Sequence, residues 1–248
     1  MRISNRKRIL ITGGAGFLGS HLCERLLAEG NDILCVDNFY SGTKDNVAHL
    51  MGNPHFELMR HDVTFPLYVE VDEIYNLACP ASPVHYQFDP VQTTKTSVVG
   101  AINMLGLAKR LKIPVFQAST SEVYGKSVHV PFREDADLVM GATTKHRWAY
   151  ACSKALDEFL ALAYWKETRQ PVIVMRFFNT VGPRQTGAYG MVIPRFVDSA
   201  RAGVPVRVYG DGRQSRCFCH VADSVEAVLR LMNSPEAVGQ VVNVGNDQ

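Results

Sequence analysis

The stretch Gly13-Gly14-Ala15-Gly16-Phe17-Leu18-Gly19 lies between a short apolar run, Arg8–Thr12, and a segment with helical periodicity, Phe17–Glu29. Glycines here permit a tight turn and let backbone N–H groups approach a pyrophosphate at a helix N-terminus. Asp37 ends the next apolar run, 18 residues after Gly19. A carboxylate there can accept both hydroxyls of an adenosine ribose and repels a 2′-phosphate, so the spacing predicts NAD and disfavours NADP. The alternative is a structural glycine turn with a solvated Asp37.

Apolar runs of strand length alternate with segments of helical periodicity along most of the chain. Continuous apolar strands joined by helices are typical of a parallel sheet covered on both faces. We therefore predict a doubly wound Rossmann α/β fold. The expected strands are Arg8–Thr12, Asp32–Asp37, His55–Met59, Glu73–Ala78, Pro114–Ala118, Pro171–Phe177 and Val241–Val244. The expected helices are Phe17–Glu29, Asp89–Leu111, Trp148–Glu167, Val192–Ala202 and Ala222–Met232.

The sequence changes in character after Asn179, where glycine, proline and arginine become frequent. We predict an NAD-binding Rossmann domain over residues 1–178 and a smaller C-terminal substrate-binding lobe over residues 179–248. Within that lobe, residues 241–244 are expected to return to the main sheet. The chain stops just after this strand, where a helix is expected. We therefore expect the lobe to be incomplete and the chain to be a fragment.

The composition is that of a globular protein with balanced charge. The chain has 248 residues, 46% of them hydrophobic and 20% charged, with 26 Lys and Arg against 24 Asp and Glu. These values exclude disorder, and a net charge of +2 offers no broad basic face for nucleic acid. No apolar run reaches the roughly 18 residues that span a bilayer, and the basic start lacks a signal-peptide pattern. We therefore predict a cytoplasmic protein that binds no membrane.

The six cysteines form no CxxC pair, which favours reduced thiols. The run Cys217-Phe218-Cys219-His220 has no second cluster of metal-ligating residues nearby in the sequence. A zinc site usually needs four ligands from such clusters, so we expect no metal.

Tyr150 and Lys154 stand four residues apart, on one face of an expected helix. A free tyrosine has a pKa of about 10 and is a poor base at neutral pH. A neighbouring lysine ammonium, together with a positive nicotinamide ring, favours the phenolate. Thr120, two residues beyond the expected fifth strand, adds a hydroxyl. Any one of these could be an ordinary surface residue, but together with the glycine stretch they predict a catalytic Thr–Tyr–Lys set.

Several longer motifs carry a resemblance to a known family. The chain resembles the extended short-chain dehydrogenase/reductases of the NAD-dependent nucleotide-sugar epimerase/dehydratase family over nearly its whole length. Residues 8–125 are most similar to UDP-glucuronate decarboxylases, and the chain from about Lys126 is more similar to bacterial NAD-dependent 4-epimerases. The motifs of the first part are Asp37–Phe39 (DNF), His61–Val63 (HDV), Ala78–Pro83 (ACPASP) and Gln117–Gly125 (QASTSEVYG). The motifs of the second part are Thr144–Lys154 (TKHRWAYACSK), Phe178–Arg184 (FNTVGPR) and Gln214–Phe218 (QSRCF).

The resemblance implies NAD as cofactor, a UDP-sugar as substrate and a homodimer. It implies that Thr120 polarises the sugar O4, that Tyr150 takes its proton and that Lys154 holds the nicotinamide ribose. The implied cofactor contacts are Gly13, Gly16, Phe17, Leu18, Gly19, Asp37, Asn38, Asp62, Val63, Leu77, Ala78, Tyr150 and Lys154. The implied substrate contacts are Ser82, Asn179, Arg184, Val208, Tyr209 and Arg216. An ordinary turn at Asp62 and Val63, a salt bridge on the lobe surface for Arg216 and a solvated Arg184 are the alternatives.

Ser121 and Glu122 narrow the reaction that the resemblance implies. Sugar 4,6-dehydratases carry an Asp–Glu pair here, and the aspartic acid expels the 6-hydroxyl; Ser121 cannot supply that proton at low cost. Decarboxylases carry Ser–Glu, whereas hexose 4-epimerases often carry small or neutral residues. Glu122 as a structural carboxylate is the alternative. The chain departs from the decarboxylases at residues 151–153, where Asp-Glu-Gly is usual, at Met191, where they have a nearby arginine, and at Ser97, where the family has asparagine.

The expected chemistry is a transient oxidation at C4 of a UDP-sugar by NAD⁺. In UDP-glucuronate the 4-ketone is β to the carboxylate, so CO₂ leaves through an enolate that Thr120 and Tyr150 stabilise, and the product is UDP-xylose. A 4-epimerase of UDP-hexose or UDP-hexuronate instead returns the hydride to the other face. We favour the decarboxylase. An inactive NAD-binding scaffold is the remaining alternative, and the complete catalytic set argues against it.

Overall fold

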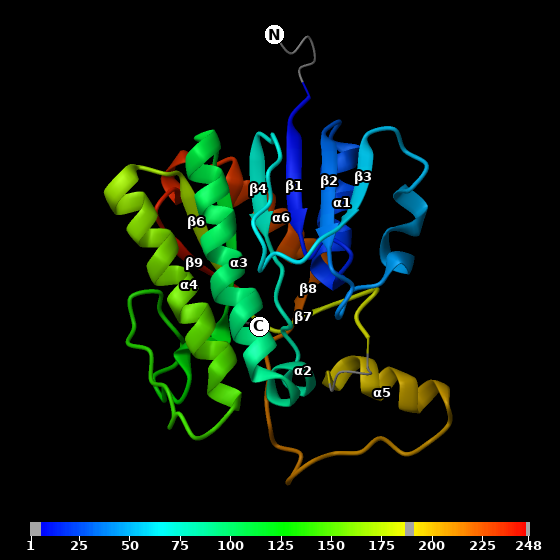
Figure 1. Cartoon of the computed structure of the whole chain (residues 1–248). Helices are drawn as coiled ribbons and strands as arrows, with labels where there is room; N and C mark the ends of the chain where they lie inside the picture. The colour runs from blue at the N-terminus through cyan, green and yellow to red at the C-terminus, as the bar shows by residue number, and fades with distance from the viewer. Residues whose placement is uncertain (1–5, 187–190, 247–248) are drawn as a thin grey trace.

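A computed structural model describes residues 6–186 and 191–246 of the chain. Its centre is a parallel sheet of seven strands in the order β3-β2-β1-β4-β5-β6-β9 (Figure 1). The predicted doubly wound sheet is therefore confirmed. The strands are β1 (Arg8–Thr12), β2 (Asp32–Asp37), β3 (Phe56–Arg60), β4 (Glu73–Asn76), β5 (Val115–Thr120), β6 (Val172–Phe177) and β9 (Val241–Val244).

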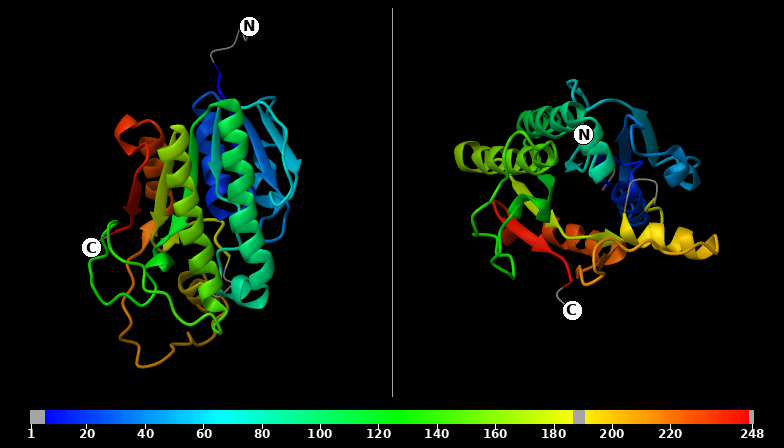
Figure 2. Two further views of the ribbon diagram at one scale, coloured as in Figure 1. Left: turned by 60° about the vertical axis from the view of Figure 1, so that its left-hand side comes forward. Right: turned by 90° about the horizontal axis from the view of Figure 1, so that it is seen from below.

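Four helices cover the two faces of this sheet. Leu22 and Leu26 of α1 and Val228 of α6 pack on one face, whereas Met104 of α3 and Ala161 of α4 pack on the other. Figure 2 shows the sheet between the two helix layers. The helices are α1 (Phe17–Ala28), α3 (Pro90–Leu111), α4 (Arg147–Thr168) and α6 (Val221–Met232).

The strand order reverses direction at β1, because β2 and β3 lie on one side of it and β4, β5, β6 and β9 on the other. In doubly wound sheets such a reversal opens a crevice at the carboxyl ends of the strands, where ligands bind. The carboxyl ends point toward the lower edge of the sheet in Figure 1. The short helices α2 (Pro83–Phe88) and η2 (Ser121–Tyr124) continue from β4 and β5 at this edge.

Three details differ from the expectations. Strand β5 continues to Thr120, which is paired with Phe177 of β6, so Thr120 is the last strand residue and does not lie beyond the strand. Helix α2 was not expected, although Ser82 caps its N-terminus and Pro83 occupies its first turn, a combination that favours helix starts. The short helix η1 (Lys44–Leu50) was not expected either.

The C-terminal part is divided between the main sheet and a separate region. Strand β9 pairs with β6, and α6 packs on the core of the sheet. A second sheet pairs β7 (Thr180–Val181) with β8 (Cys219–His220). Helix α5 (Val192–Arg201) has no buried residue, and residues 204–217 form an exposed connection. The predicted domain division at residue 178 stays a prediction.

The described part of the chain contains no helix that is both long and apolar enough to cross a membrane. All six cysteines are free thiols, with Cys219 buried and Cys217 exposed. Within residues 6–186 and 191–246, no group of three or more His, Cys, Asp or Glu side chains could hold a metal ion. The first five residues of the basic N-terminus lie outside the described residues.

Candidate active site

A cleft of about 610 Å³ opens at the carboxyl ends of the strands, next to the reversal point. This volume is in the range of cofactor and ligand pockets. Many residues predicted from the sequence line it: Gly13, Gly16, Phe17, Leu18, Gly19, Asp37, Asn38, Val63, Leu77, Ala78, Ser82, Thr120, Ser121, Glu122, Tyr150, Lys154, Asn179 and Arg184. Asp62, Val208, Tyr209 and Arg216 are not among the lining residues.

The glycine loop brings the backbone close to helix α1. A Cβ atom added to Gly19 would lie 2.2 Å from the carbonyl oxygen of Gly13 and 2.7 Å from the Cα of Gly14. Gly13 has a φ of 67°, a conformation that favours glycine. Side chains are thereby excluded where the loop meets the N-terminus of α1, and Gly13, Gly16 and the first helix residues Phe17–Gly19 line the cleft there. Such a cradle fits a pyrophosphate.

Asp37 is the buried last residue of β2 and is fixed by two backbone donors. Its carboxylate accepts hydrogen bonds from the N–H of Ala15 at 3.0 Å and from the N–H of Phe39 at 2.8 Å. Burial raises the pKa of Asp37, and these two bonds oppose the shift. Each carboxylate oxygen can accept a further bond, so Asp37 keeps acceptor capacity toward the cleft for ribose hydroxyls.

Asp62 supports the cleft wall from outside. Its carboxylate accepts from the Asn38 side chain at 3.2 Å and from the hydroxyl and N–H of Thr64 at 2.8 and 2.9 Å. Val63 lines the cleft itself, and its carbonyl oxygen accepts from Asn103 at 2.8 Å. Of these two predicted cofactor contacts, Val63 therefore lies in the cleft, whereas Asp62 holds Asn38 in place.

Thr120 and Tyr150 meet in the cleft. Tyr150 is buried, and its phenol is within side-chain hydrogen-bonding reach of Thr120. The Thr120 hydroxyl oxygen also accepts from the N–H of Glu122 at 3.2 Å, which leaves its own proton free to be donated. Burial raises the pKa of Tyr150 well above its usual value, and the Thr120 bond opposes this. Without a bound ligand, Tyr150 is therefore a protonated phenol at neutral pH.

Lys154 lies one helical turn after Tyr150 and is buried. Its ammonium donates to the carbonyl oxygen of Ala118 at 3.0 Å and to the Asp157 carboxylate at 3.2 Å. An ammonium has three N–H donors, so one remains for the cleft that Lys154 lines.

Two side chains border the reactive pair. The ring of Tyr86, on α2, is stacked on that of Tyr150 with the centroids 4.8 Å apart, and sequence reasoning missed this residue. The only available signal was the Ser82-Pro83 helix start that places Tyr86 there. Glu122 lies close enough that its charge contributes to raising the pKa of both phenols. Glu122, which is exposed, thus adds a carboxylate to the lining of the cleft that holds Thr120 and Tyr150.

The predicted substrate contacts are split between the cleft and the surface. Asn179 lines the cleft and donates to the Cys217 carbonyl oxygen at 3.0 Å, which links the two segments that lead into β7 and β8. Arg184 also lines the cleft, but its guanidinium pairs with Glu24 at 2.5 Å and donates to Ser20 at 3.2 Å. The ion pair outweighs burial and lowers the pKa of Glu24.

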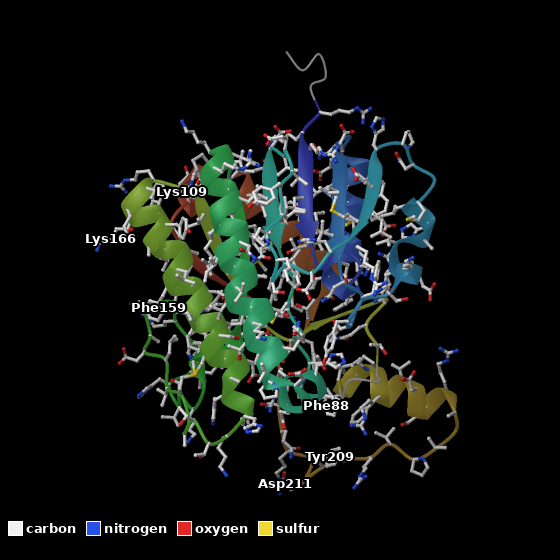
Figure 3. All side chains as sticks on the ribbon, in the orientation of Figure 1. Phe88, Lys109, Phe159, Lys166, Tyr209 and Asp211 are labelled. Atoms are coloured by element: carbon white, nitrogen blue, oxygen red, sulfur yellow. The ribbon has the colours of Figure 1, made fainter. Side chains whose placement is uncertain are left out.

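Val208, Tyr209 and Arg216 lie on the exposed connection between α5 and β8. Figure 3 shows Tyr209 at the outer edge of the molecule. Val208 and Tyr209 are 58% and 57% exposed, and the Arg216 guanidinium donates to the carbonyl oxygen of Ser215. The structure does not bring these three residues to the cleft, and their substrate roles stay predictions.

Comparisons with known proteins agree with this geometry. The family model described as "NAD dependent epimerase/dehydratase family" matches residues 9–245. The chain belongs to this family. The chain is 48% identical over 241 residues to UDP-glucuronic acid decarboxylase 4 of Arabidopsis thaliana. The aligned region covers 96% of this chain and 53% of that protein. It is 44% identical over 240 residues to decarboxylase 6 of the same plant, covering 96% and 69%.

Solved structures of the family share the fold. UDP-glucuronic acid 4-epimerase from Bacillus cereus, in complex with UDP-glucuronic acid and NAD, matches with a TM-score of 0.85 at 26% identity, covering 97% of this chain and 78% of the epimerase. The chain spans about half the length of the first curated relatives it matches. As a member of the NAD dependent epimerase/dehydratase family, it has the glycine loop, Asp37 and the Thr120–Tyr150–Lys154 set in one cleft.

Proposed function

We propose that the protein is an NAD-dependent UDP-glucuronate decarboxylase that forms UDP-xylose. The observation that carries this proposal is the Glu122 carboxylate, which lines the same cleft as Thr120 and Tyr150. The curated relatives of the chain are decarboxylases. NAD is the expected occupant of the glycine loop, Asp37 and Lys154. The cleft and the relatives of the chain support a UDP-sugar as substrate. We propose that the protein assembles as a homodimer.

Bound NAD⁺ supplies reversible oxidation at the sugar C4. Tyr150 accepts the proton of the 4-hydroxyl, and the free Thr120 proton is donated to the same oxygen. In the 4-keto acid the carboxylate is β to the ketone, so the C5–carboxylate bond breaks, CO₂ leaves and the electron pair of that bond enters the enolate. The enolate is then protonated at C5, and reversal of the C4 oxidation restores the 4-hydroxyl of UDP-xylose. Thr120 and Tyr150 stabilise the negative oxygen of that enolate, as preorganised donors do in acyl-transfer sites.

Glu122 acts through its charge. Held next to the substrate carboxylate, it destabilises the bound acid relative to the transition state that loses CO₂. Ser121 has no acidic proton of suitable strength, which leaves dehydration at C6 without an acid.

The second candidate is a UDP-sugar 4-epimerase. Met191 lines the cleft where the decarboxylases carry a nearby arginine, and residues 151–153 depart from their pattern. The fold of the UDP-glucuronic acid 4-epimerase from Bacillus cereus is closely similar. In this reaction the 4-ketone rotates in the cleft before reduction, and no carboxylate chemistry takes place.

Glu122→Gln separates the two candidates because it keeps the shape and removes the charge. For a decarboxylase, CO₂ release in single-turnover experiments should fall on the order of 10²-fold, the scale of one lost acid/base group, while UDP-glucuronate binding holds or tightens. For an epimerase, 4-epimerisation should stay within a few-fold of wild type. Undiminished decarboxylation by the variant would remove Glu122 from the mechanism.

A further inference from the structure

A buried carboxylate that the proposed reaction does not use lies behind Lys154. Asp157 is 0% exposed and stands one helical turn after Lys154 on α4. Its Oδ2 accepts from the Ser97 hydroxyl at 2.7 Å, from the Lys154 ammonium at 3.2 Å and from the Gln117 amide at 3.4 Å. Its Oδ1 has no partner among residues 6–186 and 191–246. All the hydrogen bonding of the carboxylate is thus concentrated on the oxygen that faces Lys154.

This arrangement offsets the cost of burying the positive charge of Lys154. A buried ammonium without a counter-charge loses its proton readily, and a buried carboxylate without one becomes protonated. Three elements close around the pair: α4 contributes both charges, α3 contributes Ser97 and β5 contributes Gln117 and the Ala118 carbonyl oxygen. Both atoms that accept from Lys154, in Ala118 and Asp157, are therefore held in place.

We propose that Asp157 is a positioning residue that keeps Lys154 charged and aims its remaining N–H into the cleft. This inference depends on the proposed function in one respect: the group that accepts this N–H is a ribose hydroxyl of NAD. Ser97 serves the same purpose one step further back, because its hydroxyl fixes the carboxylate. The chain departs from the family pattern at Ser97, and its contact to Asp157 gives that departure a structural role.

Neighbouring groups oppose the effect of burial on the pKa of both Lys154 and Asp157. Burial lowers the pKa of Lys154, but Cys79 in its thiolate form, Asp157 and Glu158 outweigh it and raise that pKa above its usual value. Burial raises the pKa of Asp157, and Lys154 and Ser97 oppose the rise. Tyr150 is the other titratable group of α4 that borders this part of the cleft. Removing the Asp157 charge leaves burial opposed by Cys79 and Glu158 alone, so the pKa of Lys154 should fall.

The test is Asp157→Asn in protein without cofactor, followed by nuclear magnetic resonance of labelled lysine side chains. Lys154→Met identifies the Lys154 signal. In wild type, Lys154 should stay charged up to the ordinary lysine pKa of 10.5, whereas in Asp157→Asn its pKa should be at least about one unit lower. Calorimetry should then show NAD affinity falling about tenfold for each pH unit above the lowered midpoint, in the variant only.

Glu158→Gln is the matched control. Glu158 is the next residue on α4, is also buried and pairs with Arg176 at 2.7 Å instead of with Lys154. This variant should lose thermal stability yet move the Lys154 titration less than Asp157→Asn does. Equal shifts in the two variants, or an unshifted Lys154 in folded Asp157→Asn, would overturn the proposal.

A failure of Asp157→Asn to fold is also informative. Lys154→Met/Asp157→Asn removes both charges, so it should fold where Asp157→Asn does not, because no unpaired buried charge remains. If the double variant fails as well, Asp157 supports the fold through Ser97 and Gln117, and the proposal is wrong. None of these measurements needs turnover, so a protein that releases no CO₂ would refute the proposed function and leave this result standing.

Discussion

Tyr150 carries the chemistry in this account, and its surroundings explain why it needs a ligand to work. Burial is the largest influence that raises the pKa of this phenol, and the nearby ionisable groups of Cys79, Tyr86 and Glu122 add to it, so all of them favour the protonated form. The Thr120 bond alone opposes them among the larger influences. The positive charge of an oxidised nicotinamide is of the sign needed to reverse this balance. The site is therefore expected to be inert until the cofactor is in place.

Tyr150→Phe should abolish turnover and keep cofactor binding. The change removes the phenol oxygen and leaves Asp37 and the glycine loop intact, so the rate should fall by roughly 10²–10⁴, the contribution of a general base. Turnover assays measure the loss of rate, and calorimetry with NAD measures whether cofactor binding is kept. A variant that keeps more than about a tenth of the wild-type rate would rule out Tyr150 as the base.

The pH titration of Tyr150 gives a second expectation. Because its folded pKa is raised above 10.0, the cofactor-free protein should show no tyrosinate absorbance from Tyr150 below that pH. The sign follows from linkage: a group with a raised pKa favours folding below its unfolded pKa, and this stability is lost as the pH rises toward the folded value. The difference between wild-type and Tyr150→Phe absorbance titrations isolates the group. An ionisation midpoint below 10 would contradict the burial argument.

Asp37 illustrates how one side chain serves both the fold and the ligand. Its carboxylate fixes the glycine loop through Ala15 and the following turn through Phe39. Asp37→Ala should therefore lower NAD affinity and also relax the discrimination against NADP, since an acceptor and a repelling charge disappear together. Dissociation constants for both cofactors test this. An unchanged NAD constant would leave Asp37 with a structural role only.

Among the helices and strands, the predicted regular elements were correct to within a few residues, because each strand carries a continuous apolar run and each helix a helical period. The reactive residues at element ends depend on tertiary contacts that no local pattern reveals. Thr120 belongs to β5 because β6 pairs with it up to Phe177. Tyr86 reaches Tyr150 through the short helix α2, whose six residues are too few to show a helical period. Asp157 shares a helix face with Tyr150 and Lys154, but its burial follows from the packing of α3 on α4.

The contact between the glycine loop and α1 gives a prediction on helix packing. Gly19→Ala places a methyl group against the backbone of Gly13 and Gly14, which cannot yield without moving the loop. The free energy of unfolding should fall by roughly 1–3 kcal/mol, and NAD binding should weaken.

Gly106→Ala on α3 is the control for that substitution. No atom lies within 4 Å of the added Cβ, so the helix should gain roughly 0.5–1 kcal/mol from reduced backbone freedom in the unfolded chain. Chemical denaturation measures both variants. Equal stability of the two proteins would contradict the close approach of the loop to α1.

Considered as a whole, the molecule leaves apolar side chains exposed on the outer surface of α3 and α4. Ile102, Leu156 and Phe159 are 44%, 44% and 67% exposed, and Figure 3 shows Phe159 pointing away from the molecule. Apolar side chains that gather on one surface often mark a protein interface. This surface is the one we expect to form the proposed homodimer.

Phe159→Asp should convert a dimer into a monomer, because it places a charge in the apolar interface. Phe88→Asp is the control: Phe88 is 86% exposed but lies on α2, at the lower side of the molecule in Figure 3. Light scattering after size-exclusion chromatography gives the mass of each protein. If wild type and both variants have the same mass, the interface lies elsewhere or the dimer does not form.

The mass of the reaction product tests most directly the central claim that the protein is a UDP-glucuronate decarboxylase. Wild-type protein is incubated with UDP-glucuronate and NAD⁺, and the nucleotide sugars are analysed by mass spectrometry. We predict a product lighter than the substrate by the mass of CO₂, formed only when Tyr150 is intact. A product of unchanged mass that separates as a new isomer would identify a 4-epimerase, and it would contradict the assignment of Glu122 and the cleft to decarboxylation.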